Sequence, residues 1–189
     1  AGDAGSDLMV FSSTVSASTV LGGAGEDTIS LLSAVNTSTI DLGAGADSFS
    51  FTSTLSNSTV LGGAGADTLT FGDSAKFVTS SISGGADADS LVFNAVLNSA
   101  TTVAGGAGDD IINFTKSVSG AVVSTDAGAD SITFTTNVTG STMWGGGGIQ
   151  TMVFSAAADD ATFTGGFGGG FISLGAGDDT MTFSGAGIT

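Results

Sequence analysis

Apolar and polar residues alternate along this chain in short runs, and the runs recur about every 20 residues. Each run places two apolar residues two positions apart, usually with Ser, Thr or Asn between them. Such alternation predicts a β-strand with one buried face, because successive side chains of a strand point to opposite sides. The first apolar position holds Met9, Ile29, Phe49, Leu69, Leu91, Ile112, Ile132, Met152, Ile172 and Met181, and the second holds Phe11, Leu31, Phe51, Phe71, Phe93, Phe114, Phe134, Phe154, Leu174 and Phe183.

A third apolar position lies seven residues before a recurrent aspartate. Each 20-residue repeat is therefore predicted to contain two short strands, joined on one edge by a loose Ser/Thr/Asn turn and on the other by a tight glycine turn that ends in Asp. One repeat has no partner for its apolar face, so only a stack of repeats is stable. The third position holds Val20, Ile40, Val60, Ile82, Val103, Val123, Met143 and Phe163.

This pattern predicts an all-β fold: a right-handed parallel β-roll or β-solenoid of about nine 20-residue rungs, with the Gly-Asp turns stacked on one edge. Rungs of a parallel stack lie about 4.8 Å apart, so like side chains stack on like. The absence of proline agrees, because each rung needs its backbone N–H groups for the ladders. We expect residues 1–189 to form a single solenoid domain, cut from a longer repeat array because both ends fall within repeats.

The Asp of the glycine turn recurs from Asp7 to Asp130 and forms a column. The next two positions of this column hold Gln150 and Gly170, and Asp179 follows nine residues later. Glycine permits positive φ and lets carbonyl oxygens point inward, and Ca2+ takes six to eight oxygens from carboxylates and carbonyls alike. Calcium ligands are therefore predicted at Asp7, Asp27, Asp47, Asp67, Asp89, Asp110, Asp130 and Asp179, and at the turn glycines Gly22, Gly25, Gly43, Gly45, Gly62, Gly65, Gly84, Gly105, Gly108, Gly128 and Gly177.

Two interpretations are open for a single Gly-Asp turn. A metal-free turn forms readily, because Asp hydrogen-bonds locally and Gly supplies positive φ. An unbroken column of Asp favours calcium, because carboxylates stacked about 4.8 Å apart repel one another unless a cation lies between them. Folding is then predicted to depend on calcium. At Gln150 and Gly170 the metal-free turn is favoured, and sites there are expected to be weak or missing.

The remaining acidic residues divide into three groups. Those directly before a column Asp are expected to face solvent: Glu26, Asp109 and Asp178. Those that replace a turn glycine are candidates for additional ligands: Asp3, Asp87 and Asp126. The pair Asp159-Asp160 lies toward the other edge and is expected in a solvated loop.

Residues 22–30 and 62–70 match the pattern G-G-x-G-x-D-x-U-x, in which U is apolar, at each fixed position. This nonapeptide resembles the RTX, or hemolysin-type, calcium-binding repeats of bacterial secreted proteins, and degenerate copies cover nearly the whole chain. The resemblance implies ions held between successive turns by the Asp and by turn carbonyls, roughly seven or eight of them at one per pair of neighbouring rungs. It also implies secretion and folding outside the cell, where calcium is abundant. The chain departs from the family because the nonapeptide occupies essentially one edge.

Charge and composition limit the classes of binding partner that this chain can have. The sequence has eighteen acidic residues and two basic ones, Lys76 and Lys116, which gives a net charge of −16. Nucleic acid and anionic membranes both require a basic surface, so neither is an expected partner, whereas cations are. No apolar run is long enough to cross a membrane. Without cysteine, stability must come from packing, backbone ladders or metal.

Catalysis is not expected. The sequence contains no His and no Cys, and its many Ser and Thr residues have no partner that would activate them. The favoured interpretation is an extracellular structural repeat module, such as a segment of a surface layer, an adhesin or a filament. Its expected partners are calcium and either other copies of itself or a cell-surface glycan.

The alternative interpretation is a calcium-dependent ice-binding β-solenoid, suggested by outward Ser and Thr residues on both sides of the first apolar position. Large apolar residues interrupt this array at Leu8, Ile111 and Phe171, and Val92 and Val153 interrupt its second column. The pairs that form it are Thr28/Ser30, Ser48/Ser50, Thr68/Thr70, Ser131/Thr133 and Thr180/Thr182.

Overall fold

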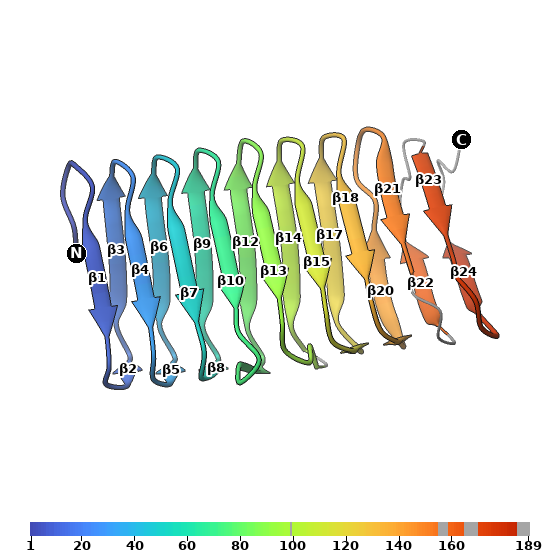
Figure 1. Ribbon diagram of the computed structural model, residues 1–189, viewed down its shortest axis with the longest axis horizontal. Helices are drawn as coiled ribbons and strands as arrows, with labels where there is room; N and C mark the ends of the chain where they lie inside the picture. Colours follow the sequence, from blue (N-terminus) through green and yellow to red (C-terminus); the bar gives the residue numbers. More distant parts are fainter. Residues whose placement is uncertain (99, 155–158, 165–169, 185–189) are drawn as a thin grey trace.

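The chain folds into a right-handed parallel β-solenoid in a computed structural model, which describes residues 1–98, 100–154, 159–164 and 170–184 (Figure 1). Strands run up one long face and down the other, and the rungs follow one another along the long axis of the molecule (Figure 1). All regular elements among the described residues are strands. No helix long and apolar enough to cross a membrane is found in this part of the chain. The predicted fold class is confirmed.

Two sheets of nine described strands form the long faces. Sheet 1 follows the glycine turns and contains β1 (Leu8–Phe11), β4 (Thr28–Leu31), β7 (Ser48–Phe51), β10 (Thr68–Phe71), β13 (Ser90–Phe93), β15 (Ile111–Phe114), β18 (Ser131–Phe134), β21 (Gln150–Val153) and β23 (Gly170–Ser173). Sheet 2 precedes them and contains β3 (Thr19–Ala24), β6 (Thr39–Ala44), β9 (Thr59–Ala64), β12 (Ser81–Ala86), β14 (Thr102–Ala107), β17 (Val122–Ala127), β20 (Ser141–Trp144), β22 (Asp160–Thr164) and β24 (Thr180–Ser184).

The three apolar columns pair in the predicted register over most of the chain. In sheet 1, Leu69 pairs with Leu91 and Phe71 with Phe93. The Phe rings stack at this repeat: the Phe93–Phe114 centroids lie 4.9 Å apart and the Phe114–Phe134 centroids 5.0 Å apart, with interplanar angles of 18° and 5°. The inward side chains of sheet 2 pack against this stack, so the core is continuous from rung to rung.

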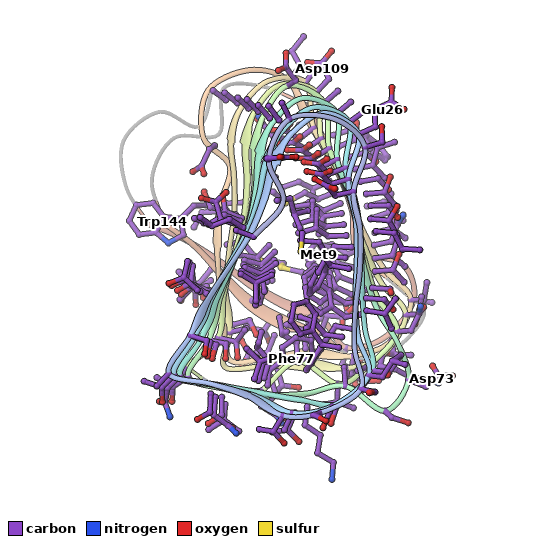
Figure 2. All side chains as sticks on the ribbon, turned by 90° about the vertical axis from the view of Figure 1, so that its left-hand side faces the viewer. Met9, Glu26, Asp73, Phe77, Asp109 and Trp144 are labelled. Carbon is purple, nitrogen blue, oxygen red and sulfur yellow. The ribbon has the colours of Figure 1, made fainter. Side chains whose placement is uncertain are left out.

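The edge opposite the glycine turns is a third face and not the loose turn expected from the sequence. It contains β2 (Val15–Ser16), β5 (Val35–Asn36), β8 (Thr54–Ser56) and β11 (Lys76–Val78) in one sheet, and β16 (Val118–Ser119) and β19 (Val138–Thr139) in another. Its inward residues form a fourth buried apolar column, and the cross-section is correspondingly wide at this edge, as the position of Phe77 in Figure 2 shows. That column is Val15, Val35, Leu55, Phe77, Leu97, Val118 and Val138.

A sharp corner joins the third face to sheet 2. The residue at the corner has a left-handed backbone, as at Asn57 (φ 48°). The buried Ser58 beside it donates from Oγ to the Ser56 carbonyl at 2.7 Å and accepts the backbone N–H of Ser38 at 3.0 Å. This serine therefore satisfies polar groups of two rungs at once, which explains why the repeat keeps small polar residues there.

The 20-residue register continues to β24, and it places the last strand differently from the predicted alignment. β24 pairs with β22, which sets Met181 beside Ala161 and Phe183 beside Phe163. Met181 and Phe183 thus belong to sheet 2, and their prediction as members of the sheet 1 columns is wrong. The turn that contains Gly177 joins β23 to β24, so it lies on the edge opposite the other Gly-Asp turns.

Candidate metal centre

The column aspartates are joined to one another by backbone-to-carboxylate hydrogen bonds. The N–H of Asp67 donates to Oδ1 of Asp89 at 2.8 Å, and the N–H of Asp89 donates to Oδ1 of Asp110 at 2.9 Å. The same bond runs from Asp7 through Asp130 at distances of 2.7 to 3.0 Å. The glycine turn makes this possible, since it ends each sheet 2 strand and points the next side chain back into the narrow edge, where Figure 2 shows a row of carboxylates.

In five of these aspartates the second carboxylate oxygen is buried without a hydrogen-bond donor. Oδ2 of Asp27, Asp47, Asp67, Asp89 and Asp110 has no partner, although each of these residues is at most 3% exposed. A buried charged oxygen without a partner is costly, so protein interiors pair such groups or coordinate them to a metal. The lysines do not supply the pairing: Lys76 lies in β11 on the third face, and Lys116 lies between β15 and β16.

At Asp27, Asp67, Asp89 and Asp110 the unpaired Oδ2 faces an oxygen of the next rung across a space left by a glycine. This inner glycine lies five residues before the column Asp, as Gly84 does before Asp89. A Cβ atom at Gly84 would lie 2.4 Å from Oδ2 of Asp89 and 2.6 Å from the carbonyl oxygen of Gly105, which belongs to the next rung. At Gly62 the corresponding distances are 2.5 Å to Asp67 and 2.1 Å to the Gly84 carbonyl. Two rungs therefore direct oxygens toward one point that carries no side chain.

Burial shifts the protonation of these carboxylates. Removal from water raises the pKa of Asp89 to about 7; the hydrogen bond with the Asp67 backbone lowers it, and the charges of neighbouring aspartates raise it further. The pKa of Asp67 and that of Asp110 are each raised to about 6, again mainly by burial.

A calcium ion fits this oxygen set. Calcium is a hard cation that takes carboxylate and carbonyl oxygens in a flexible geometry. The described residues contain no group of three or more His, Cys, Asp and Glu side chains that could hold a metal, so carbonyls would have to supply most ligands beside one carboxylate per interval. The groups that would hold it are the carboxylate of the column Asp and the carbonyl of the inner position in the next rung.

The predicted glycines divide by position. The inner glycines border the space just described: Gly22, Gly62, Gly84 and Gly105. The glycines two residues before the Asp all have positive φ, between 113° and 152°: Gly25, Gly45, Gly65, Gly108 and Gly128. Gly43 belongs to neither set, because it lies four residues before Asp47, and the atoms nearest to a Cβ there belong to the backbone of Gly23. In its rung the inner position carries Leu42, which is fully buried, so the space beside Asp47 is filled by a side chain.

The prediction that Asp179 continues the Asp column is wrong. Asp179 stacks on Asp159 at the opposite edge, where its Oδ1 accepts the N–H of Asp159 at 3.0 Å. Asp159 is 1% exposed, so its expected place in a solvated loop is also wrong, whereas Asp160 is exposed. Asp159 accepts the N–H of Val138 at 2.7 Å, and burial raises its pKa. Gly177 lies in the turn beside Asp179 and not with the other turn glycines.

The remaining acidic residues lie outside the column. Glu26, Asp109 and Asp178 are exposed, as expected. The three candidates for additional ligands are exposed as well and make local contacts. Asp3 donates its N–H to Oδ2 of Asp7 at 3.1 Å, Asp87 accepts the N–H of Gly65 at 3.1 Å, and Asp126 accepts a hydrogen bond from Ser124. None of these contacts brings their carboxylates to the unpaired oxygens.

The sequence placed Gln150 in the column, with a weak or missing metal site, but it did not reveal the hydrogen bonds of Gln150 or the role of Thr125. Gln150 is fully buried at a column position, and Nε2 of its amide lies 3.3 Å from Oδ2 of Asp130 and 3.1 Å from the Gly128 carbonyl oxygen. Thr125 replaces an inner glycine and is also fully buried. The sequence does show that Thr and Gln replace the usual Gly and Asp of the repeat at these two positions. That both side chains are buried could be known only from the fold.

Comparisons with known proteins add little. No protein-family model matches the chain, and no curated protein matches it. Among solved structures, it is similar to the X-ray crystal structure of a hyperactive, Ca2+-dependent, beta-helical antifreeze protein from an Antarctic bacterium. The two share 18% identity over 96% of this chain and 81% of that chain, with a TM-score of 0.44. At this identity and TM-score, the similarity gives no basis for inferring what the present chain binds.

Proposed function

We propose that this chain is a non-catalytic, extracellular structural module that binds several Ca2+ ions along its Asp column and depends on them for a stable fold. The observation that carries the proposal is the row of buried Oδ2 atoms without a donor, which at Asp27, Asp67, Asp89 and Asp110 also face a carbonyl of the next rung. A bound cation would supply the missing charge at every such interval. Bound calcium would then hold neighbouring rungs together through oxygens that belong to both.

The nonapeptide pattern supports membership of the RTX, or hemolysin-type, group of secreted repeat proteins. Calcium is scarce inside cells and abundant outside, so a calcium-dependent solenoid would fold after export. The acidic surface and the absence of His and Cys support a structural role in preference to catalysis. A segment of a surface layer, an adhesin or a filament is the role that we propose.

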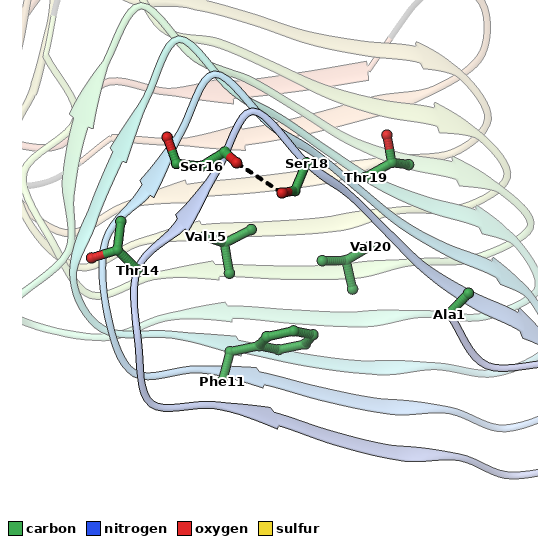
Figure 3. Close-up of a pocket in the computed structure, with 8 residues that line it drawn as sticks. All are labelled: Ala1, Phe11, Thr14, Val15, Ser16, Ser18, Thr19 and Val20. Atoms are coloured by element: carbon green, nitrogen blue, oxygen red, sulfur yellow. Dashed lines mark hydrogen bonds between the residues drawn. The ribbon is translucent and has the colours of Figure 1, made fainter.

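Self-association is part of this proposal. A pocket of about 430 Å3 at the first rung is lined by residues that include Phe11, Val15 and Val20 (Figure 3). Leu8 and Phe171 are outward residues of the first and last sheet 1 strands, and they are 72% and 60% exposed. A second copy would cover these apolar residues. Light scattering after size exclusion should show calcium-dependent oligomers that Leu8→Ser weakens, whereas a monomer at all calcium concentrations would contradict self-association.

The direct test of the function is to count bound calcium by native mass spectrometry after dialysis. The wild type should bind several ions and Asp89→Asn fewer, because Asn keeps the acceptor for the Asp67 N–H but removes the charge. Glu26→Gln is the matched control, since it removes an exposed charge one residue from the column and should leave the count unchanged. Absence of bound calcium in the wild type would rule the proposal out.

Ice binding is the second candidate, supported by the outward face of sheet 1. Three consecutive rungs present Thr28/Ser30, Ser48/Ser50 and Thr68/Thr70 in register. Beyond them the face is broken by Val92 and Ile111, and Thr180/Thr182 lies in sheet 2, so this pair is not part of the array.

Thermal hysteresis distinguishes the two functions. An ice-binding face predicts hysteresis that Ser48→Tyr abolishes and that Thr59→Tyr, an outward change in β9 of sheet 2, leaves intact. No hysteresis at high concentration in calcium would exclude ice binding and leave the structural proposal standing.

A further inference from the structure

One interval of the Asp column differs from the others in its donors. Between the rungs of Asp130 and Gln150, the Gln150 amide nitrogen lies within hydrogen-bond distance of both Oδ2 of Asp130 and the Gly128 carbonyl. Asp130 is 2% exposed, like its neighbours in the column, but its Oδ2 has a donor. The carboxylate oxygen that lacks a donor at Asp67, Asp89 and Asp110 is therefore satisfied here.

The second oxygen of the same interval is satisfied as well. Thr125 occupies the inner position where the neighbouring rung has Gly105. Its Oγ1 donates to the carbonyl oxygen of Gly145 at 2.6 Å. Gly145 holds the inner position of the following rung, as Gly105 does relative to Gly84, so its carbonyl corresponds to the one that faces the space at Gly84.

Two neutral donors thus take the places at which the intervals of Asp67, Asp89 and Asp110 present only oxygens, while Oε1 of Gln150 is buried without a partner. We propose that Thr125 and Gln150 replace a calcium ion, so that this interval is a calcium-independent junction within a calcium-dependent stack. The inference rests on the proposed function, because it assigns which intervals use the ion. Both changes are needed together: the amide alone leaves the Gly145 carbonyl without a donor, and the hydroxyl alone leaves the Asp130 carboxylate charged and unpaired.

The junction also has consequences for the fold in chelator. Its hydrogen bonds do not require an ion, and the rings of Phe134 and Phe154 stack beneath it at 4.8 Å. The rungs from Asp67 to Asp110 have no such substitute and should open first when calcium is removed. Order should therefore persist around β17, β18, β20 and β21 after it is lost in β9, β10, β12 and β13.

Two measurements test the inference. Restoring the repeat with Thr125→Gly/Gln150→Asp should raise the calcium count by one ion in native mass spectrometry. Thr142→Gly/Thr151→Asp, which makes the same exchanges at nearby outward, half-buried positions, should not. If the wild type binds calcium and the double variant gains no ion, the inference is wrong and the proposed function stands. If the wild type binds no calcium, the proposed function itself is wrong.

Hydrogen exchange in chelator provides the second measurement and needs no variant. Amides of residues 122–134 and 141–153 in the wild type should exchange more slowly than those of residues 59–71 and 81–93. The double variant should lose this difference in chelator and recover protection in calcium. Uniform exchange along the wild-type solenoid in chelator would contradict a calcium-independent junction.

Discussion

Gln150 donates its side-chain amide to Oδ2 of Asp130 across one rung, at 3.3 Å. The same oxygen of Asp110, one rung earlier, is equally buried and has no donor. Among the buried carboxylates of this column, five therefore have an Oδ2 without a partner, whereas that of Asp130 accepts a side-chain amide. Calcium is the partner that we propose for those five.

Adding one methyl group at an inner glycine tests the space where the rungs meet. Gly84→Ala places a Cβ 2.4 Å from Oδ2 of Asp89 and 2.6 Å from the Gly105 carbonyl, so the interval must open and its calcium should be lost. Overpacking of this kind costs about 1–3 kcal/mol. Chemical denaturation in calcium measures the loss, and Gly147→Ala is the control because nothing lies within 4 Å of its Cβ. Equal stability of the two variants would contradict the site geometry.

The phenylalanine stack should dominate the stability of the middle rungs. Phe114 is fully buried between Phe93 and Phe134, and Phe114→Ala should lower the free energy of unfolding by about 3–5 kcal/mol. Phe114→Leu keeps most of the volume and should cost less, about 1–1.5 kcal/mol. Both values come from urea unfolding in saturating calcium. A Leu variant as unstable as the Ala variant would show that ring stacking matters more than volume.

Stability should change with pH in opposite directions with and without calcium. In chelator, Asp67, Asp89 and Asp110 have pKa values of about 6, 7 and 6, above the ordinary 3.8, so the folded chain holds protons that the unfolded chain releases. The contribution of these three aspartates to the free energy of unfolding is complete below pH 3.8 and is lost as the pH rises through 6 to 7.

Thermal melts measure this pH dependence. In chelator the melting temperature should fall as the pH rises from 5 to 8, whereas in calcium it should rise, because protons compete with the ion for the same carboxylates. The same trend under both conditions would show that the column does not bind the ion.

The serine corners predict a further stability effect. Ser58→Ala removes the acceptor of the Ser38 N–H, which is then buried without a partner, and this should cost about 1–3 kcal/mol. Ser12→Ala, at an exposed position, should change stability by less than about 0.5 kcal/mol. Urea unfolding of both variants provides the comparison, and a neutral Ser58→Ala would mean that the corner relaxes around the change.

The repeat spacing predicted the long sheets and the Asp column because both depend on strict periodicity. Val60 beside Ile82 and Asp67 beside Asp89 follow directly from alignment of the repeats. The third face escaped prediction because its strands are only two or three residues long, too short to alternate visibly, although Leu55 and Phe77 already occupy a regular apolar position.

Prediction failed near the C-terminus for a physical reason. After Gln150 the glycine turns no longer mark a single edge, so a nonapeptide alone does not say which edge it occupies. Pairing decided it: β24 lies beside β22, which places Asp179 beside Asp159. The role of Thr125 likewise could not be read from the sequence, since a threonine in a Thr-rich chain looks ordinary until its hydroxyl is found buried against a carbonyl.

Circular dichroism with and without calcium tests the central claim most directly. Strand signal should be reduced in chelator and restored by millimolar calcium, while magnesium, which demands a tighter octahedral geometry, should restore it poorly. Full strand signal in chelator, with a denaturation midpoint that calcium does not change, would contradict a solenoid that is held together by calcium.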